Sequence, residues 1–372
     1  MSEHVKLSEV CEILNSNVDK KIKENEQKVK LCNFTDVYNN WAITKYTSKK
    51  FMKATATQNE INKFSLKKGY VAITKDSETK DDIGISTYIA DNFDNVLLGY
   101  HCTLLKPNQK VLNGKFLNAY LNSFYGRKYF SNCASGSGQR YTLTIDTIKD
   151  LNIPLINIET QQKIARTLSV LDQKIENNHK INELLHTLAY KVYEYYFKYK
   201  TKNAKLEQII IENPKSSIMV KNAQKTQDKY PFFTSGDNIL SYPKAIIDGR
   251  NCFLNTGGNA GIKFYVGKAS YSTDTWCICA NEFSDYLYLL LSSIKNHINQ
   301  SFFQGTSLKH LQKNLLKKYP IYMPSAHEIK KFNQIIMPLL TLISINTRTS
   351  KKLEQIRDFL LPLLLKQQVK PQ

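Results

Sequence analysis

Residues 158–188, IETQQKIARTLSVLDQKIENNHKINELLHTL, determine the fold that we expect for this chain. Apolar residues recur along this stretch at spacings of four and three, which is the period of an amphipathic α-helix. The apolar positions of the stripe are Ile164, Leu168, Leu171, Ile175, Leu185 and Leu188. The sequence therefore predicts one long helix that buries a narrow face.

The same stripe occurs a second time, 168 residues further along the chain. The residues at the matching positions are all apolar: Phe332, Ile336, Leu339, Ile343, Leu353 and Ile356. The context repeats as well, because a glycine-containing turn, a short apolar stretch and a proline precede each helix, in residues 136–155 and 304–324. A repeat of this kind indicates one unit copied twice. We therefore expect the order domain, long helix, domain, long helix.

Polar residues interrupt both stripes at matching central positions, which are Asn178 and Asn182 in the first helix and Asn346 and Ser350 in the second. A stripe with heptad spacing requires a partner helix, and polar residues within it set the register. We expect an antiparallel pair in which Asn178 and Asn346 lie close together, with an interface of Ile164, Leu168, Leu171, Ile175, Asn178, Leu185, Phe332, Ile336, Leu339, Ile343, Asn346 and Leu353. The alternative is that each helix lies on its own domain. Pro338 removes one backbone hydrogen bond from the second helix and favours a kink there.

The segments between the helices have the pattern of mixed α/β domains. In the first segment, residues 64–75 predict a strand, a turn and a second strand; residues 97–107 predict another strand, and residues 114–130 a helix. The second segment repeats this order, with strands and glycine turns in residues 245–258 and 263–272 and a helix in residues 283–298. The expected fold class is α+β, with two similar mixed α/β domains, each followed by a long helix, and the two helices packed as an antiparallel coiled coil.

The charge of the chain favours a polyanionic partner. The 372 residues include 52 Lys and Arg against 32 Asp and Glu, which gives a net charge of +20. The excess is +6 in residues 1–155 and +7 in residues 201–325, so it is not confined to a tail. Nucleic acid is the polyanion that such a distribution favours. The alternative is a basic protein from a lysine-rich and asparagine-rich proteome.

Composition also excludes several classes of protein. With 42% hydrophobic and 23% charged residues, the chain is neither generally disordered nor fibrous. The longest apolar stretches, near residues 286–291 and 359–365, are far shorter than the ~20 residues of a membrane span. The first residues lack the layout of a secretion signal, and the seven cysteines include no CxxC pair. We therefore expect a cytoplasmic protein with free thiols and no membrane partner.

These residues carry a resemblance to a known family. The chain resembles the DNA specificity subunit of type I restriction-modification systems over nearly its whole length. FLNTGGNAGIKFYVGKASYSTDTW (residues 253–276) is similar to the strand and glycine loop of that family, and KFSLKKGYVAITK (residues 63–75) resembles its first-domain stretch, with Tyr70 where Asp is usual. SGSGQRYTLTIDTIKDLNIPL followed by ETQQKI resembles the passage into the helix, whereas AHEIKKF in the second copy keeps only part of that pattern.

The resemblance implies a domain organisation and a set of partners. It implies a target recognition domain in residues 1–157, a central long helix in 158–200, a second target recognition domain in 201–325, a C-terminal long helix in 326–366 and a tail in 367–372. Each domain would bind one half of a split target in double-stranded DNA. Two modification (methyltransferase) subunits and the restriction subunits would bind this chain, which would itself be non-catalytic. No cofactor is expected on this chain; S-adenosylmethionine, ATP and Mg are expected on the partner subunits.

A search for catalytic residues favours binding over catalysis. A DNA methyltransferase acting alone would require a glycine-rich cofactor loop and an NPPY-like motif, and the nearest text is Asn213-Pro214-Lys215. The glycines of residues 257–261 precede a strand pattern rather than a helix, so no helix N-terminus faces a phosphate. The acidic-x-lysine strings of a nuclease, as in residues 76–80, are expected by chance in a lysine-rich chain, and the histidines have no metal-ligand spacing. A stand-alone coiled-coil nucleic-acid-binding protein remains the alternative.

DNA contacts are expected from loops that carry Lys and Arg for phosphates and Asn, Gln, Ser, Thr or Arg for base edges. In the first domain the expected residues are Lys49, Lys50, Lys53, Lys75, Gln139 and Arg140. In the second domain they are Asn255, Asn259, Lys263, Gln304, Thr306, Ser307 and Lys309. No metal-binding or catalytic residue is predicted.

Overall fold

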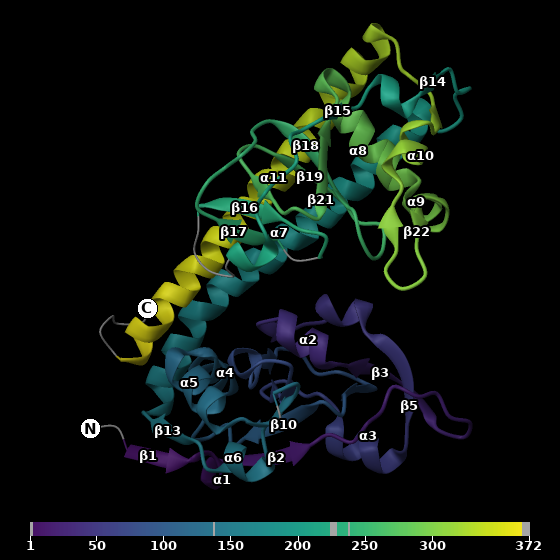
Figure 1. The fold of residues 1–372 in the computed structure, drawn as a ribbon. Coiled ribbons are helices and arrows are strands. Elements are labelled where there is room, and N and C mark those ends of the chain that lie inside the picture. The colour runs from purple at the N-terminus through teal and green to yellow at the C-terminus, as the bar shows by residue number, and fades with distance from the viewer. Residues whose placement is uncertain (1–2, 137, 224–228, 237–238, 367–372) are drawn as a thin grey trace. The chain divides into compact units, whose positions relative to one another are not determined.

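The computed structural model describes residues 3–136, 138–223, 229–236 and 239–366. The chain forms two compact units (Figure 1). Unit 1 consists of Met1–Gln173 and Ile356–Gln372, and unit 2 of Lys174–Gln355. The two long helices, α7 (Ile158–Phe197) and α11 (Ala326–Leu365), are divided between the units. Each globular segment therefore packs against the beginning of one long helix and the end of the other.

Unit 1 is built on a five-stranded sheet of order β2-β10-β6-β8-β4. Its strands are β2 (Cys11–Asn15), β10 (Cys102–Pro107), β6 (Val71–Thr74), β8 (Ser86–Ile89) and β4 (Ala42–Ile43). The first three pairings are antiparallel, and β4 pairs with β8 in parallel. The smaller sheets are formed by β5 (Met52–Ala56), β3 (Gln27–Cys32) and β9 (Val96–Leu98); by β11 (Ser135–Gly136), β12 (Tyr141–Thr142) and β7 (Asp76–Ser77); and by β1 (Glu3–Lys6) and β13 (Asn152–Leu155).

Unit 2 repeats this topology with four strands in its main sheet instead of five. Its main sheet has the order β15-β21-β18-β19, all antiparallel, with β15 (Ile211–Glu212), β21 (Thr275–Cys279), β18 (Arg250–Asn255) and β19 (Ile262–Val266). The smaller sheets are formed by β17 (Leu240–Tyr242), β16 (Tyr230–Phe233) and β20 (Ser270–Tyr271); by β22 (Phe303–Gln304) and β23 (His310–Leu311); and by β14 (Ala204–Lys205) and β24 (Pro320–Ile321). In both units the second sheet joins one antiparallel and one parallel pair. The predicted duplication is therefore present at the level of topology.

The last three short helices before each long helix follow the same order in both units. Unit 1 contains α1 (Leu7–Val10), α2 (Phe34–Asn39), α3 (Gln58–Phe64), α4 (Gly114–Asn122), α5 (Phe124–Cys133), α6 (Ile145–Lys149), η1 (Thr47–Lys50) and η2 (Lys80–Asp82). Unit 2 contains α8 (Ser284–Ser293), α9 (Lys295–Ser301), α10 (Lys313–Lys317), η3 (Leu206–Gln208), η4 (Val220–Asn222) and η5 (Asn281–Phe283). The two helices predicted as continuous, in residues 114–130 and 283–298, are each broken into two.

Two other local predictions also need correction. The first of the two strands expected in residues 64–75 is absent, because Phe64 is the last residue of α3 and Ser65 forms only an isolated bridge with Leu97; β6 is the second strand. The single strand expected in residues 97–107 is two strands, β9 and β10. Gly69 precedes β6 with a φ of +97°, and Gly249 precedes β18 with a φ of +98°. Both positions lie in the left-handed region that glycine adopts without a steric penalty, so each central strand begins from the same kind of turn.

The long helices begin with equivalent caps 168 residues apart. The Asn157 side-chain oxygen accepts from the Thr160 N–H at 2.7 Å. The Ser325 hydroxyl accepts weakly from the Glu328 N–H, and the Glu328 carboxylate accepts from the Ser325 N–H at 3.0 Å. Side-chain acceptors at these positions satisfy backbone donors that have no partner inside the helix. Despite Pro338, α11 continues without a break to Leu365.

Each unit has its own core, to which both long helices contribute. In unit 1, Ile164 and Leu168 of α7 and Leu361 and Leu364 of α11 are buried together with the sheet and α4. In unit 2, the leucines of α8 pack against β18 and β21 and against the other ends of α7 and α11. Burying an aliphatic side chain stabilises a fold by about 1.5–3 kcal/mol. The helices are therefore integral to both cores.

Candidate DNA interface and paired helices

In unit 1 the structure brings together three of the predicted DNA-binding residues. Gln139 and Arg140 lie exposed in the turn between β11 and β12. The Leu143 N–H donates to the Lys75 carbonyl at 2.8 Å, so this hairpin is attached to the end of the central strand β6. The hairpin and the strand end form one polar surface, which we call the unit 1 reading surface.

The other predicted residues of unit 1 come from a separate segment. Lys49 and Lys50 lie at the end of η1, and Lys53 lies in β5, where it is opposite Lys30 of β3. All three predicted lysines are exposed. Their contact with the phosphate oxygens of DNA stays a prediction.

Two residues of the unit 1 reading surface were missed from the sequence. The Asp76 carboxylate lies 2.8 Å from Nδ1 of His101 and accepts a hydrogen bond from the Thr142 hydroxyl at 3.0 Å. Arg140 lies beside both, with Nη2 3.8 Å from Asp76 Oδ2 and 3.2 Å from His101 Nδ1. These residues are far apart in the sequence, and no spacing rule would have connected them. Asp76 begins the acidic-x-lysine segment of residues 76–80, and its carboxylate belongs to this cluster.

Unit 2 presents the equivalent surface. The Gly258 N–H donates to the Lys309 carbonyl at 2.9 Å, and Gly257 pairs with His310, so the glycine loop after β18 is attached to the β22–β23 hairpin. The predicted residues Gln304, Thr306, Ser307 and Lys309 are exposed on this hairpin, and Asn259 is exposed on the glycine loop. We call this the unit 2 reading surface. Whether these side chains contact DNA stays a prediction.

Two predicted DNA-binding residues of unit 2 have internal roles. Asn255 is buried, and its side-chain amide donates to the Asn259 carbonyl at 3.1 Å. The Lys263 ammonium donates to the Thr234 carbonyl at 2.8 Å and approaches the Asn255 side-chain oxygen. Gly261 is required here, because a Cβ atom at that position would collide with the Asn255 side chain. Both side chains hold the glycine loop in shape, with Asn255 buried and Lys263 half-buried, and their contact with DNA stays a prediction.

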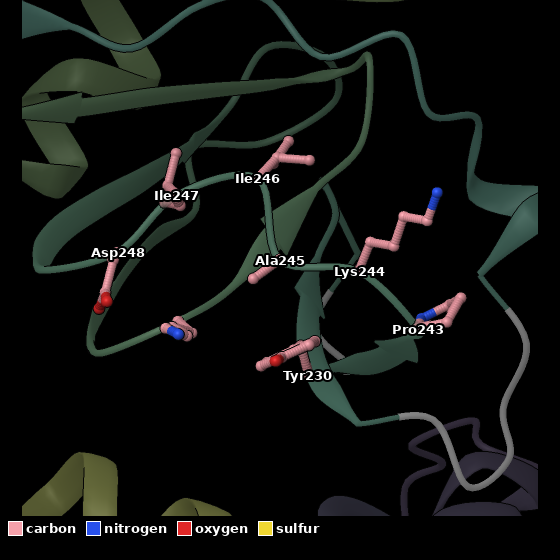
Figure 2. A pocket seen from close by; sticks show the side chains of 8 residues that line it. Tyr230, Pro243, Lys244, Ala245, Ile246, Ile247 and Asp248 are labelled. Atoms are coloured by element: carbon pink, nitrogen blue, oxygen red, sulfur yellow. The ribbon is translucent and has the colours of Figure 1, made fainter.

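A separate hollow of about 550 Å³ lies in unit 2. Figure 2 shows that residues 243–248 form one side of it and that Tyr230 contributes from β16. Exposed Lys244 and Lys268 also line it. Asp248 lines it as well, so the hollow carries two ammonium groups and one carboxylate. In the described ranges, His, Cys, Asp and Glu side chains form no cluster of three or more that could hold a metal.

The two long helices run antiparallel within each unit. In unit 2 the ring centroids of Phe197, near the end of α7, and Phe332, near the beginning of α11, lie 4.9 Å apart. Most of the predicted interface is buried or half-buried: Ile164, Leu168, Leu171, Ile175, Leu185, Phe332, Ile336, Leu339, Ile343 and Leu353. Leu188 and Ile356 belong to the apolar stripes but not to the predicted interface, and they are 48% and 38% exposed. The antiparallel coiled coil is confirmed.

The central polar residues pair differently from the prediction. Asn178 donates to the Ser350 hydroxyl at 3.1 Å, and Asn346 donates to the Asn182 side-chain oxygen at 2.9 Å. A pseudo-twofold axis that exchanges residues 168 apart turns one of these pairs into the other. The axis passes between the two pairs, so Asn178 meets the counterpart of Asn182 and not Asn346. Asn178 and Asn346 therefore bond other residues of the polar centre rather than each other.

Replacing Asn346 with Leu should destabilise unit 2 by about 1–3 kcal/mol, because the Asn182 side-chain oxygen loses its donor. Replacing both Asn182 and Asn346 with Leu should recover much of this loss, since neither amide then lacks its partner. Asn177→Leu, at the exposed neighbour of Asn178, is the matched control. The measurement is the free energy of unfolding by denaturant. An Asn346→Leu variant as stable as the wild type would contradict the assigned pairing.

The duplicated sheets, the hairpins attached to them and the paired helices are features that both units share. The family model for the type I restriction modification DNA specificity domain matches residues 2–187 and 200–355, and the chain belongs to this family. The family membership that the sequence predicted is therefore confirmed, together with DNA target recognition as its role. In the described part of the chain, no helix is long and apolar enough to cross a membrane.

Similar proteins agree with this assignment. The chain is 25% identical over 341 residues to the type I restriction enzyme MjaIX specificity subunit of Methanocaldococcus jannaschii. The matched region covers 80% of this chain and 74% of that protein. The chain is also 30% identical over 136 residues to the type I restriction enzyme HindI specificity subunit of Haemophilus influenzae. That matched region covers 36% of this chain and 29% of that protein. The fold is similar to that of the type I restriction-modification S subunit from M. genitalium, with a TM-score of 0.55 at 17% identity over 98% of this chain and 96% of that one.

Proposed function

We propose that the chain reads a DNA target in two separate parts, one with each reading surface. The observation that carries this proposal is the repetition of one surface on one topology with different side chains. In each unit a hairpin is hydrogen-bonded to the end of the central strand, through Lys75 and Leu143 in unit 1 and through Gly258 and Lys309 in unit 2. A common scaffold with different chemistry suits two different base sequences.

We further propose that the paired helices act as a spacer between the two reading surfaces. Each long helix has 40 residues, which at 1.5 Å per residue is about 60 Å, more than one DNA turn of roughly 34 Å. The hydrogen bonds of Asn178 and Asn346 favour a single register of the pair. A fixed register would give the target a fixed spacing between its two parts.

The partner subunits would bind along the outside of α7. Ile181, Leu184, Leu188 and Tyr195 are exposed and recur at spacings of three, four and seven, so they form a second apolar stripe. An exposed stripe with this spacing fits an amphipathic helix of another protein. We propose two modification subunits as its occupants. S-adenosylmethionine would be bound by those subunits, and ATP and Mg by the complex with the restriction subunits, with this chain contributing no catalytic group.

The test is to map methylated sites in DNA treated with this chain and its modification subunit. A chimera in which residues 201–325 come from a relative should change one part of the methylated target and leave the other part and the spacing unchanged. The chain without the modification subunit should transfer no methyl groups. If both parts of the target changed together in the chimera, the two units would not read independently. Methylation by the chain alone would contradict a non-catalytic role.

A further inference from the structure

The cluster of Asp76, His101 and Arg140 has a geometry that suits a base pair. The Asp76 side chain is largely buried and accepts from the Thr142 hydroxyl, so the carboxylate is held in place by β12. The His101 ring lies 2.8 Å from this carboxylate through Nδ1 and packs on the Tyr100 ring at 3.7 Å between centroids. The position of the imidazole is therefore determined on one side by an acceptor and on the other by an aromatic ring.

The hydrogen bond to Asp76 determines which His101 nitrogen can meet another molecule. A carboxylate accepts, so Nδ1 carries the hydrogen, and in the neutral ring Nε2 is then an acceptor. With the hydrogen on Nδ1 donated to Asp76, the Arg140 Nη2 atom at 3.2 Å is a close neighbour of the ring and not its hydrogen-bond donor, and Nε2 is left for an outside partner. In the described part of the chain no serine, threonine or cysteine side chain bonds this ring. The pair thus has no nucleophile to activate, and binding is the chemistry that remains.

Arg140 adds donors beside this acceptor. Its side chain is 61% exposed, and its guanidinium lies 3.2 Å from the imidazole. In the major groove a G·C pair presents the guanine O6 and N7 acceptors and the cytosine N4 amino donor. An arginine next to a histidine acceptor matches both halves of that pattern. An A·T pair presents a different arrangement of donors and acceptors.

The equivalent position of unit 2 lacks this cluster. The pairing of Asp76 with Thr142 in unit 1 corresponds to the pairing of Gly257 with His310 in unit 2, since residues 142 and 310 are 168 apart. Glycine has no carboxylate, and the neighbouring Thr256 hydroxyl donates to the Asp274 backbone carbonyl instead. The backbone arrangement is shared while the charged side chains are not. This is the pattern expected where two reading surfaces select different bases.

We propose that Arg140 and His101 together read one G·C pair in the part of the target bound by unit 1, and that Asp76 is the positioning residue that orients His101. The inference rests on the proposed function, because it assumes that unit 1 reads a DNA part of its own. The proposal assigns the specificity at one base pair to three residues from separate segments. Asp76 lies in β7, His101 immediately before β10, and Arg140 in the turn between β11 and β12.

The experiment uses this chain with its modification subunit and measures methylation rates on duplexes in which each base pair of the unit 1 part is changed in turn. The wild type should require G·C at one position. His101→Ala should reduce the discrimination at that position alone by roughly tenfold, the order expected for loss of one specific base contact. Asp76→Asn should relax the same position, and the double variant no further than His101→Ala. Asp150→Asn, which removes another ion-paired aspartate of unit 1, is the matched control.

The outcomes separate this inference from the proposed function. If His101→Ala slowed methylation of every duplex equally, or relaxed an A·T position, the inference would be overturned. Additive losses in the double variant would show that Asp76 does not act through His101, and would also overturn it. If the wild type showed no base preference in any part assigned to unit 1, the proposed two-part reading itself would fail. Melting temperatures of all variants establish that each one is folded.

Discussion

The affinity of this chain for DNA is expected to fall by about 10³- to 10⁴-fold between roughly 50 and 200 mM salt. The chain carries a net charge of +20, of which +6 and +7 lie in the two globular segments, and this charge favours about 6 to 8 phosphate contacts in total. Each contact releases counterions, so the logarithm of the affinity should fall with the logarithm of salt concentration with a slope of roughly −5 to −7. Equilibrium titrations on a duplex at several salt concentrations measure this slope.

Variants of the exposed lysines give this titration a control. Lys49→Gln with Lys50→Gln should weaken binding to every sequence and make the slope shallower by about 2, if both residues contact phosphates. Gln139→Ala should leave the slope unchanged, because its side chain is neutral. A slope near zero for the wild type would reject DNA as the main polyanionic partner. An unchanged slope in the lysine variant would remove these two residues from the interface.

Replacing Arg250 with Met should destabilise unit 2 by about 3–5 kcal/mol, the largest effect on stability that we expect from a single substitution. Arg250 forms two hydrogen bonds of 2.5 Å with the Asp285 carboxylate, whose side chain is 2% exposed. It also donates to the Thr341 hydroxyl and to the Met337 carbonyl of α11. The substitution would leave a buried carboxylate without its cation and would disconnect β18 from the long helix.

The pH dependence of this variant follows from the same carboxylate. Burial raises the pKa of Asp285, and the Arg250 guanidinium opposes that rise. Without Arg250 the folded-state pKa lies further above the unfolded value, so protonation favours the folded state and the deficit should shrink as the pH falls. Denaturant unfolding over an acidic pH series measures this. Arg250→Met combined with Asp285→Leu should recover most of the stability. A single variant that unfolds like the wild type at neutral pH would contradict the role of this ion pair.

The duplication, the long helices and the family could all be predicted from the sequence. Helical periodicity is local, and the spacing from Ile164 to Ile175 indicates an apolar stripe whatever the rest of the chain does. The copy 168 residues later predicts a second helix with the same stripe, and the two stripes favour the antiparallel pair that the structure shows. The caps at Asn157 and Ser325 and the turns at Gly69 and Gly249 are likewise local features.

The partners within the helix pair depended on the three-dimensional structure. Ser350 lies one helical turn after Asn346. If one helix is shifted along the other by one turn, the partner of Asn178 changes from Asn346 to Ser350. Every register that keeps apolar residues opposite apolar residues satisfies the sequence pattern. The packing of both units against the helix ends selects one of them, and no local pattern contains that information.

The sequence by itself determined the family, the repeated order of elements and the positions of the reading loops, because each of these depends on residues close together in the chain. Only the tertiary structure showed which side chains those loops present. It turned Asn255 and Lys263 inward to hold the glycine loop, and it joined Asp76, His101 and Arg140 from three separate segments. Hydrogen bonds of this kind depend on distances between segments that the folding of the sheet creates, and those distances are not written in any local spacing of residues.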